Sequence, residues 1–232
     1  MVKHFVPLLN NQSVMAKKKN ITKNDIISFY MDYVLEHNHQ PKTVYAFAKA
    51  SNFEEQKFYD HFGSFEAVEK HVFTAFYHNT ITVLEKSDDY TSFDARNKLL
   101  SFYFTFFENL TANRSYVKYA LEHHKSDLKS MSLLKDLKRV FTDYIASLEI
   151  DLIDIKQEQI DRIQQRGLKE TAWFQLLLTL KFWIDDTSPG FEKTDIFIEK
   201  SVNTSFDVLN VAPIRTLIDF GKFIFKEKIQ MN

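Results

Sequence analysis

The sequence contains no cysteine, which excludes disulfides, thiolate metal sites and a cysteine nucleophile. It has only 4 Gly and 4 Pro among 232 residues, too few for the many tight turns of a β-sandwich or β-barrel. The formal net charge is -1, so no overall basic field draws the chain towards nucleic acid. These absences favour an all-α protein from a reducing compartment, and we expect a cytoplasmic location.

Long hydrophobic runs are also missing. The most apolar run, residues 173–184, is broken by Gln175, Thr179 and Lys181, and it is shorter than the roughly 20 residues that a membrane span requires. Residues 1–16 have a single Lys, a brief apolar patch and no small-residue cleavage site, which makes a poor signal peptide. We therefore predict no membrane span, and either Met1 or Met15 could be the initiating residue.

Motifs for catalysis and cofactor binding are missing as well. The sequence has no Gly-rich phosphate loop, nucleophile elbow or pair of carboxylates at catalytic spacing. His123 and His124 are adjacent, so on a helix they point in different directions and cannot share a metal ion without other ligands. We predict no catalytic residue, no metal site and no cofactor, and hence not an enzyme.

What the chain does have is helical periodicity. Aromatic residues make up 15% of it, with 23 Phe, which supplies ample apolar area for packed helices. Apolar residues recur at three-and-four spacing almost throughout, and strand signals are absent. After a first helix that ends at 37–41, the pattern predicts helices near 43–50, 54–61, 64–86, 92–110, 114–125, 130–150, 155–166, 168–186, 194–211 and 213–228.

Capping residues mark several of these boundaries. The N-cap candidates are Thr22 or Asn24, Thr43, Ser64 and Thr194, with Pro213 at a first helical position. Asn52 suits a left-handed turn position between the second and third helices. Gly63 is expected at the C′ position of the third helix.

The stretch from Phe47 to Val68 is the most informative part of the chain. Phe47-Ala48, a turn at 51–53 and the run 59–62 (YDHF) follow one another at a fixed spacing, after Thr43-Val44. With a helix before it and a long helix after it, this stretch resembles the helix-turn-helix unit of the TetR family of transcriptional regulators.

The resemblance implies an all-α, TetR-like fold in which a small three-helix DNA-binding domain is joined to a larger helical bundle. We expect a flexible basic arm at 1–22 and a helix-turn-helix domain at 23–66. Residues 67–232 would then form a ligand-binding and dimerisation domain.

In such a unit the third helix enters the major groove of DNA, while the flanking helices contact phosphates. Carried onto this sequence, the resemblance implies DNA contacts by Thr43, Tyr45, Gln56, Lys57, Tyr59 and His61. The basic run Lys17, Lys18 and Lys19 is either a solvated tail or an arm laid on DNA, and we include it among the expected DNA contacts.

The charges of this unit depart from the family pattern. Glu54 and Glu55 stand where the family usually has a small hydroxyl residue and a basic one, and Phe65 replaces a common basic residue. Residues 24–80 contain four Lys and eight Asp or Glu, a net charge of -4. Two carboxylates at the start of the third helix favour its dipole, but they would also repel a phosphate backbone.

The resemblance also implies a ligand cavity and a dimer interface in the larger domain. Residues 101–107 (SFYFTFF) place aromatics all around one helix, which is either simply buried or lines an apolar pocket. The expected ligand-binding residues are Phe102, Tyr103, Phe106, Tyr116 and Tyr119.

The segment 168–186 carries more apolar surface than one buried stripe requires. It is either an ordinary interior helix or, together with 194–211, half of a two-fold four-helix interface. The expected interface residues are Trp173, Leu177, Leu180, Trp183, Ile184, Ile198 and Val202.

The sequence thus predicts a ligand-responsive transcriptional regulator, a homodimeric repressor that a hydrophobic small molecule releases from DNA. The acidic third helix keeps a second hypothesis open. In that alternative, a TetR-like protein has lost DNA binding and acts as a lipid- or isoprenoid-binding accessory protein.

Overall fold

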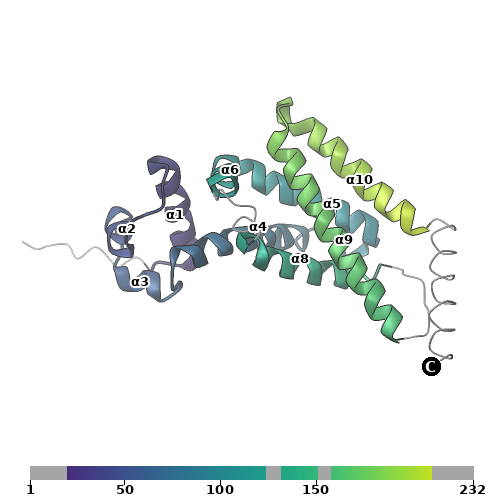
Figure 1. The fold of residues 1–232 in the computed structure, drawn as a ribbon, viewed down its shortest axis with the longest axis horizontal. Coiled ribbons are helices and arrows are strands. Elements are labelled where there is room, and N and C mark those ends of the chain that lie inside the picture. Colours follow the sequence, from purple (N-terminus) through teal and green to yellow (C-terminus); the bar gives the residue numbers. More distant parts are fainter. Residues whose placement is uncertain (1–19, 124–131, 151–157, 211–232) are drawn as a thin grey trace, which may run out of the picture.

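The computed structural model describes residues 20–123, 132–150 and 158–210, and within these ranges it is helical with no strand (Figure 1). The α-helices are α1 (Lys23–His37), α2 (Val44–Ala50), α3 (Glu55–Tyr59), α4 (Phe65–Leu84), α5 (Ala95–Ala112), α6 (Arg114–His123), α8 (Lys135–Ser147), α9 (Glu158–Asp185) and α10 (Glu192–Asn210). Two 3₁₀ helices, η1 (Tyr90–Ser92) and η2 (Pro189–Phe191), precede α5 and α10. The expected all-α fold is confirmed. The predicted helix at 213–228 lies outside the described residues.

Side-chain caps define the first two helices, as the sequence predicted. Thr22 and Asp25 form a capping box at α1: the Asp25 amide donates to Thr22 Oγ1 at 3.2 Å, and the Thr22 amide donates to Asp25 Oδ2 at 2.9 Å. Asn38 ends α1 with a φ of 54°. Thr43 Oγ1 caps α2 by accepting from the Ala46 amide at 3.1 Å.

The predicted turn after α2 is confirmed, whereas the predicted end of α3 is wrong. Asn52 has a φ of 56°, which confirms its left-handed position. Helix α3 is shorter than the predicted 54–61, because its C-cap is Asp60. Gly63 therefore is not the C′ residue, and among the described glycines only Gly190 has a positive φ. Ser64 caps α4 by accepting from the Ala67 amide, as expected.

Aromatic packing fixes α1, α2 and α3 relative to one another. Phe47 of α2 and Phe58 of α3 are fully buried, with ring centroids 6.1 Å apart. Both rings also pack on the ring of Phe65 at the start of α4, with centroid distances of 5.5 Å for Phe47 and 5.2 Å for Phe58. Such aromatic contacts add to the free energy gained from the buried area alone. This small core holds the outer faces of α2 and α3 in a defined orientation.

Helix α4 joins this three-helix end to the rest of the molecule. Figure 1 shows α1–α3 together at one end, with α4 leading into the bundle formed by α5, α6, α8, α9 and α10. Helix α4 packs on α1 and also on α5 and α8. It therefore contributes to both parts, and the domain division at 66/67 remains a prediction.

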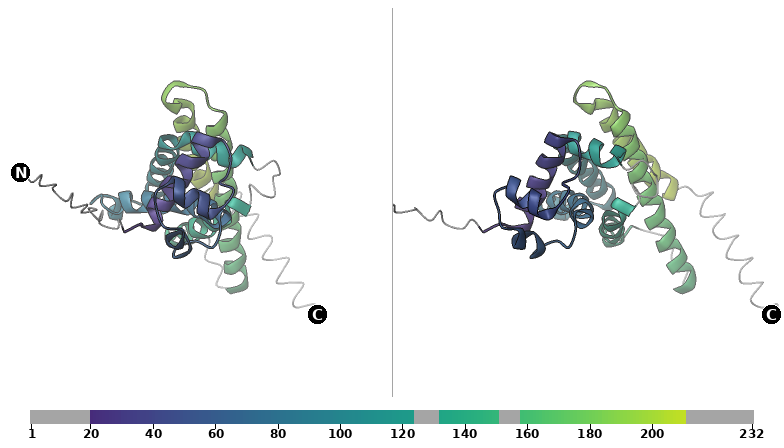
Figure 2. Two further views of the ribbon diagram at one scale, coloured as in Figure 1. Left: turned by 90° about the vertical axis from the view of Figure 1, so that its left-hand side faces the viewer. Right: turned by 60° about the vertical axis from the view of Figure 1, so that its left-hand side comes forward.

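The prediction of two helices at 155–166 and 168–186 is wrong. A single helix, α9, runs from Glu158 to Asp185 through Gly167. A glycine inside a helix costs roughly 0.5–1 kcal/mol relative to alanine, which does not suffice to break a helix that packs on its neighbours. Helices α9 and α10 run side by side along one face of the bundle (Figure 2).

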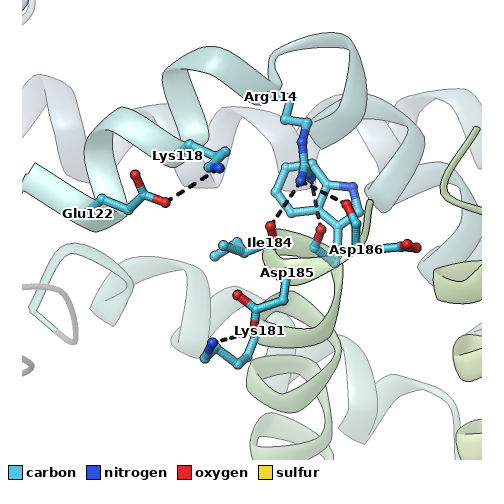
Figure 3. A network of polar contacts seen from close by, with 8 residues as sticks. Arg114, Lys118, Glu122, Lys181, Ile184, Asp185 and Asp186 are labelled. Atoms are coloured by element: carbon cyan, nitrogen blue, oxygen red, sulfur yellow. Dashed lines mark hydrogen bonds and ion pairs between the residues drawn. The ribbon is translucent and has the colours of Figure 1, made fainter. Parts of the chain in front are cut away.

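Arg114, the first residue of α6, fastens the end of α9 (Figure 3). Its guanidinium donates to the carbonyl oxygens of Trp183 and Ile184, both at 2.9 Å, and lies 4.4 Å from the ring centroids of Trp183 and Phe191. The last carbonyls of a helix have no partner within the helix, so the arginine satisfies them. This contact fixes the corner between α9 and α10 against α6.

The prediction that Thr194 is an N-cap is wrong. Thr194, expected as an N-cap, lies in the first turn of α10, and its amide and hydroxyl donate to Asp186 Oδ2 at 3.0 and 2.7 Å. Burial by itself raises the pKa of Asp186, but the hydrogen bonds from Thr194 and Ser188 outweigh it and hold that pKa well below its usual value. Across the described ranges, no helix has the length and apolar character needed to cross a membrane.

Candidate functional site

The outer face of the α2–α3 pair exposes most of the residues expected to contact DNA. Tyr45 and Tyr59 are 62% and 55% exposed, which is unusual for large aromatic side chains. Thr43 and Gln56 are also exposed, and the Thr43 hydroxyl can still donate outward, because it only accepts in its cap. The packed rings beneath keep these side chains on a rigid support.

The positive charge of Lys57 on this face is compensated by a carboxylate. Lys57 Nζ forms an ion pair with Asp60 Oδ2 at 2.9 Å. The hydrogen bond that Lys57 donates to Asp60, the charge of Asp60 and the charge of Glu54 raise the pKa of Lys57, so the lysine stays protonated. Glu55 lies in the first turn of α3, where a carboxylate favours the helix dipole. A phosphate approaching α3 would therefore meet carboxylates beside its single lysine.

His61, which is predicted to contact DNA, is exposed and also makes a hydrogen bond within the domain. Its Nε2 lies 3.2 Å from the carbonyl oxygen of Ile21, which can only accept, so Nε2 is the donor. This bond ties the end of α3 to the segment before α1. Lys17, Lys18 and Lys19 lie outside the described residues.

The residues expected to bind a ligand are mostly packed in the core. Phe102, Tyr103, Phe106 and Tyr116 are 0–1% exposed, and Tyr119 is half-buried. The rings of Phe102 and Phe106 stack with centroids 5.4 Å apart. None of the five residues lines either of the two apolar pockets described below. The aromatic segment of α5 is thus mostly buried, with Phe104 exposed, which is closer to the first of the two interpretations that the sequence allowed.

Two hydroxyls in this core have no hydrogen-bond partner among the residues that the structure describes. The Oη atoms of Tyr103 and Tyr116 are buried and unpaired, and burial raises the pKa of both groups. Each phenol therefore stays neutral at any physiological pH.

An apolar pocket lies instead between α5, α8, α9 and α10. Its volume is about 390 Å³, within the range usual for small-molecule sites. The lining residues are Leu99, Ile145, Ile150, Gln164, Gly167, Leu168, Thr171, Ala172, Gln175, Thr204, Ser205, Phe206, Val208 and Leu209. None of these described residues carries a charge, and the list covers only the part of the chain that the structure describes.

The residues predicted for the dimer interface mostly face the interior of the protomer. Five of the seven are buried at 0–7% exposure: Trp173, Leu180, Trp183, Ile198 and Val202. Leu177 and Ile184 are half-buried and pack against the same core. These side chains fill the core of their own bundle, so a second copy could not reach the five buried ones without rearrangement.

A second apolar face on α9 and α10 is exposed. Phe174, Leu178, Phe182 and Ile196 are 60%, 45%, 36% and 50% exposed. The ring of Phe182 stacks on Phe197 at 4.6 Å, which joins the two helices across this surface. We call Phe174, Leu178, Phe182, Ile196 and Phe197 the outer apolar face, and a shallow groove of about 650 Å³ runs along it. The i, i+4, i+8 spacing of the first three could have revealed it from sequence.

Helices α1, α4 and α6 meet at a buried polar contact that sequence reasoning did not find. Tyr30 Oη of α1 donates to Glu69 Oε1 of α4 at 2.6 Å, and Glu69 is only 8% exposed. Burial, the Glu69 charge and this hydrogen bond all raise the pKa of Tyr30. Tyr116 of α6 is buried close enough to Glu69 for their charges to interact. The position of α1 is thus linked to that of the larger bundle.

Comparison with known proteins gives one result. The family model described as Tetracyclin repressor-like, C-terminal domain matches residues 98–224, more than half of the chain. No curated protein matches the sequence. The matched region runs from α5 to beyond α10 and includes both apolar pockets.

Proposed function

The chain belongs to the tetracycline-repressor-like (TetR) family, and on that premise we propose that it is a ligand-responsive transcriptional regulator. In this proposal it acts in the cytoplasm as a homodimeric repressor. Its α2–α3 pair is a helix-turn-helix that binds DNA, and a hydrophobic small molecule releases it.

The observation that carries the proposal is the outer face of α2 and α3. Tyr45, Gln56 and Tyr59 are exposed there, on two short helices that a common aromatic core holds together. Tyrosine hydroxyls suit phosphate oxygens, and a glutamine amide suits the edge of an adenine. The face thus offers polar groups for both kinds of DNA contact.

The carboxylates on this face set the expected strength of binding. Because Asp60 neutralises Lys57, and Glu54 and Glu55 repel phosphates, α3 would add little electrostatic affinity. The basic run 17–19 would supply much of the attraction to the phosphate backbone, as arms do in other DNA-binding proteins. We therefore expect a specific but weak DNA binder whose attraction to phosphates comes mainly from residues 17–19.

The outer apolar face is the proposed dimer interface. Exposed apolar side chains that lie together on two adjacent helices favour burial against a second copy, and a two-fold axis would build a four-helix interface from α9 and α10. This replaces the residues chosen from sequence with a neighbouring face of the same helices.

In the dimer, a ligand-induced shift of the two protomers relative to each other would abolish DNA binding. Two reading helices must lie about 34–36 Å apart to enter successive major grooves, so a small change in their separation suffices. Helix α4 and the Tyr30–Glu69 contact link α1 to the ligand domain. A movement of the ligand domain would therefore move α1–α3 with it.

Selection of genomic fragments on the purified protein tests the proposal. We expect recovery of a palindromic site, and Gln56→Ala should weaken binding to it by about 1–3 kcal/mol if Gln56 reads a base. Gln165→Ala on α9, an exposed glutamine remote from α3, is the matched control. Recovery of fragments with no common sequence would contradict the proposal.

The carboxylates of α3 favour a second candidate function. If Glu54, Glu55 and Asp60 prevent contact with DNA, the protein would retain the fold only to bind a lipid or isoprenoid as an accessory protein. Both candidates require a hydrophobic ligand, so ligand binding does not separate them. Binding of DNA of any sequence at low salt does, because only the regulator requires it.

A further inference from the structure

A shallow groove between α8 and α9 collects basic side chains in a chain that is slightly acidic as a whole. Its volume is about 480 Å³, and among the residues that the structure describes it is lined by Lys138, Thr142, Arg162, Gln165, Arg166, Lys169 and Glu170. Four of these residues are cationic and one is anionic, a net charge of +3, whereas the whole chain has a net charge of -1. Neither of the two candidate functions uses this concentration of positive charge.

Both walls of the groove contribute to it. On α9, Arg162, Arg166 and Lys169 follow one another at i, i+4 and i+7 spacing, which places them on one face of the helix. They extend over about 10 Å along the helix axis, given the rise of an α-helix. Helix α8 supplies Lys138 and the hydroxyl of Thr142 on the opposite wall. A ligand in the groove would therefore meet cations on two sides.

The protein itself compensates part of this charge. Lys138 Nζ pairs with Glu170 Oε2 at 2.8 Å, which engages the carboxylate that lines the groove. The side chains of Arg166 and Lys169 form no ion pair or hydrogen bond with any residue that the structure describes. Like charges three or four residues apart destabilise a helix. An anion bound in the groove would offset that repulsion.

The arginine side chains favour phosphate as the anion. A guanidinium presents parallel N–H donors that match the oxygens of a phosphate, and Arg162 and Arg166 offer two such groups. A single phosphate is too small to contact all the cations of α9 at once, because they are spread over about 10 Å. Two linked phosphates can contact both arginines and Lys169. The groove therefore suits a diphosphate better than a single phosphate.

A nucleic-acid backbone suits the groove less well. Figure 1 shows the first half of α9 on the side of the bundle away from α1–α3, so DNA held by the α2–α3 face would not reach it. Helix α8 also exposes Asp136 and Asp143, which would repel an extended polyanion. A compact anion can occupy the groove without approaching the rest of the surface.

We propose that the groove between α8 and α9 binds a molecule that carries a diphosphate group. Arg162 and Arg166 donate to its oxygens, and Lys169 adds a third positive charge. The group belongs to a dissolved diphosphate ester or to a lipid headgroup, since both present the same chemistry. The inference goes beyond the proposed function and does not depend on it, because the groove shares no lining residue with either apolar pocket and lies apart from the α2–α3 face.

Isothermal titration calorimetry of the full-length protein at fixed ionic strength tests the inference. We expect inorganic diphosphate to bind one site per protomer, on the order of tenfold more tightly than orthophosphate. Equal affinities for the two anions, or no binding of either, would overturn the inference. A random DNA duplex that displaces diphosphate at equal phosphate concentration would also overturn it, because the groove would then belong to a nucleic-acid backbone.

Two variants with matched controls locate the site. Arg166→Gln should weaken diphosphate on the order of tenfold, whereas Arg139→Gln, at an exposed position of α8 outside the groove lining, should change the affinity little. Glu170→Gln should strengthen binding, because it removes a carboxylate and releases Lys138, while Glu199→Gln on α10 should not. A gain of affinity cannot result from misfolding. Equal effects within either pair would indicate diffuse attraction and refute the site.

Two diphosphate esters identify the source of the group. ADP is titrated into the protein, and phosphatidylcholine vesicles that contain diacylglycerol diphosphate are sedimented with it, each with the unmodified chain and with Arg166→Gln. Binding of ADP that the variant loses assigns the groove to a dissolved ester. Co-sedimentation that the variant loses, without binding of ADP, assigns it to a lipid headgroup. If neither ester binds while inorganic diphosphate does, the groove takes the free ion alone and the inference fails.

Discussion

Phe174→Ala should dissociate the proposed dimer. A phenylalanine buries about 200 Å² in full, so the 60% exposed at Phe174 leaves about 120 Å² to be covered by a partner. At about 25 cal/mol per Å² this is about 3 kcal/mol per protomer, and two-fold symmetry doubles it to about 6 kcal/mol. Part of that sum is offset by the cost of ordering the Phe174 side chain in the interface. Even half of it would raise the dimer Kd on the order of a hundredfold.

Sedimentation equilibrium over a range of protein concentrations measures this change. Phe104→Ala is the matched control, because Phe104 is 39% exposed on α5 and is not part of the outer apolar face. Far-UV circular dichroism should show both variants folded. The reasoning is refuted if Phe174→Ala dissociates no more readily than Phe104→Ala, or if the unmodified protein is monomeric at the highest concentration.

Three further predictions concern α1, α3 and α4. Glu55→Lys should strengthen binding to non-specific DNA, whereas Glu199→Lys on α10, with the same change of net charge, should not. Fluorescence anisotropy of labelled DNA measures both affinities. Equal binding curves for the two variants would show that α3 does not contact DNA. Tyr30→Phe should lower the free energy of unfolding by about 1–3 kcal/mol, because the buried Glu69 carboxylate loses a donor, and an unchanged urea midpoint would argue against this. Burial lowers the pKa of His71, so the unfolded chain takes up its proton at a higher pH than the folded one, and the free energy of unfolding should fall as the pH drops below 6.5. In urea titrations at several pH values, His71→Gln should make that fall less steep. Parallel pH profiles for the variant and the unmodified protein would contradict this.

The sequence predicted the small domain well because its local signals agree with one another. The caps at Thr22, Thr43 and Ser64 and the left-handed Asn52 each act over three or four residues. The predictions for Thr43, Ser64 and Asn52 are confirmed, and of the two candidates for the first cap, Thr22 and Asn24, the structure has Thr22. Helix α3 ends earlier than the sequence predicts, because Gly63 lies three residues beyond the C-cap Asp60 and is not the C′ residue. Local chemistry thus determined where helices begin better than where they end.

The larger domain was harder to predict because its helices are apolar on more than one side. In α9 both Trp173 and Phe174 are large and aromatic, and only packing decides that the first is buried and the second exposed. The break expected at Gly167 failed for a similar reason, since tertiary contacts outweigh a single weak helix former. The pocket depends on four helices far apart in sequence, and no periodicity in one of them could indicate it.

The measurement that tests the central claim most directly is the affinity for duplex DNA as a function of salt concentration. If the α2–α3 face and the basic arm contact several phosphates, log Kd should rise with log salt with a slope of several units, and binding should be clear at the lowest salt. An affinity that is undetectable at low salt, for selected and random duplexes alike, would contradict the claim that this protein is a DNA-binding regulator.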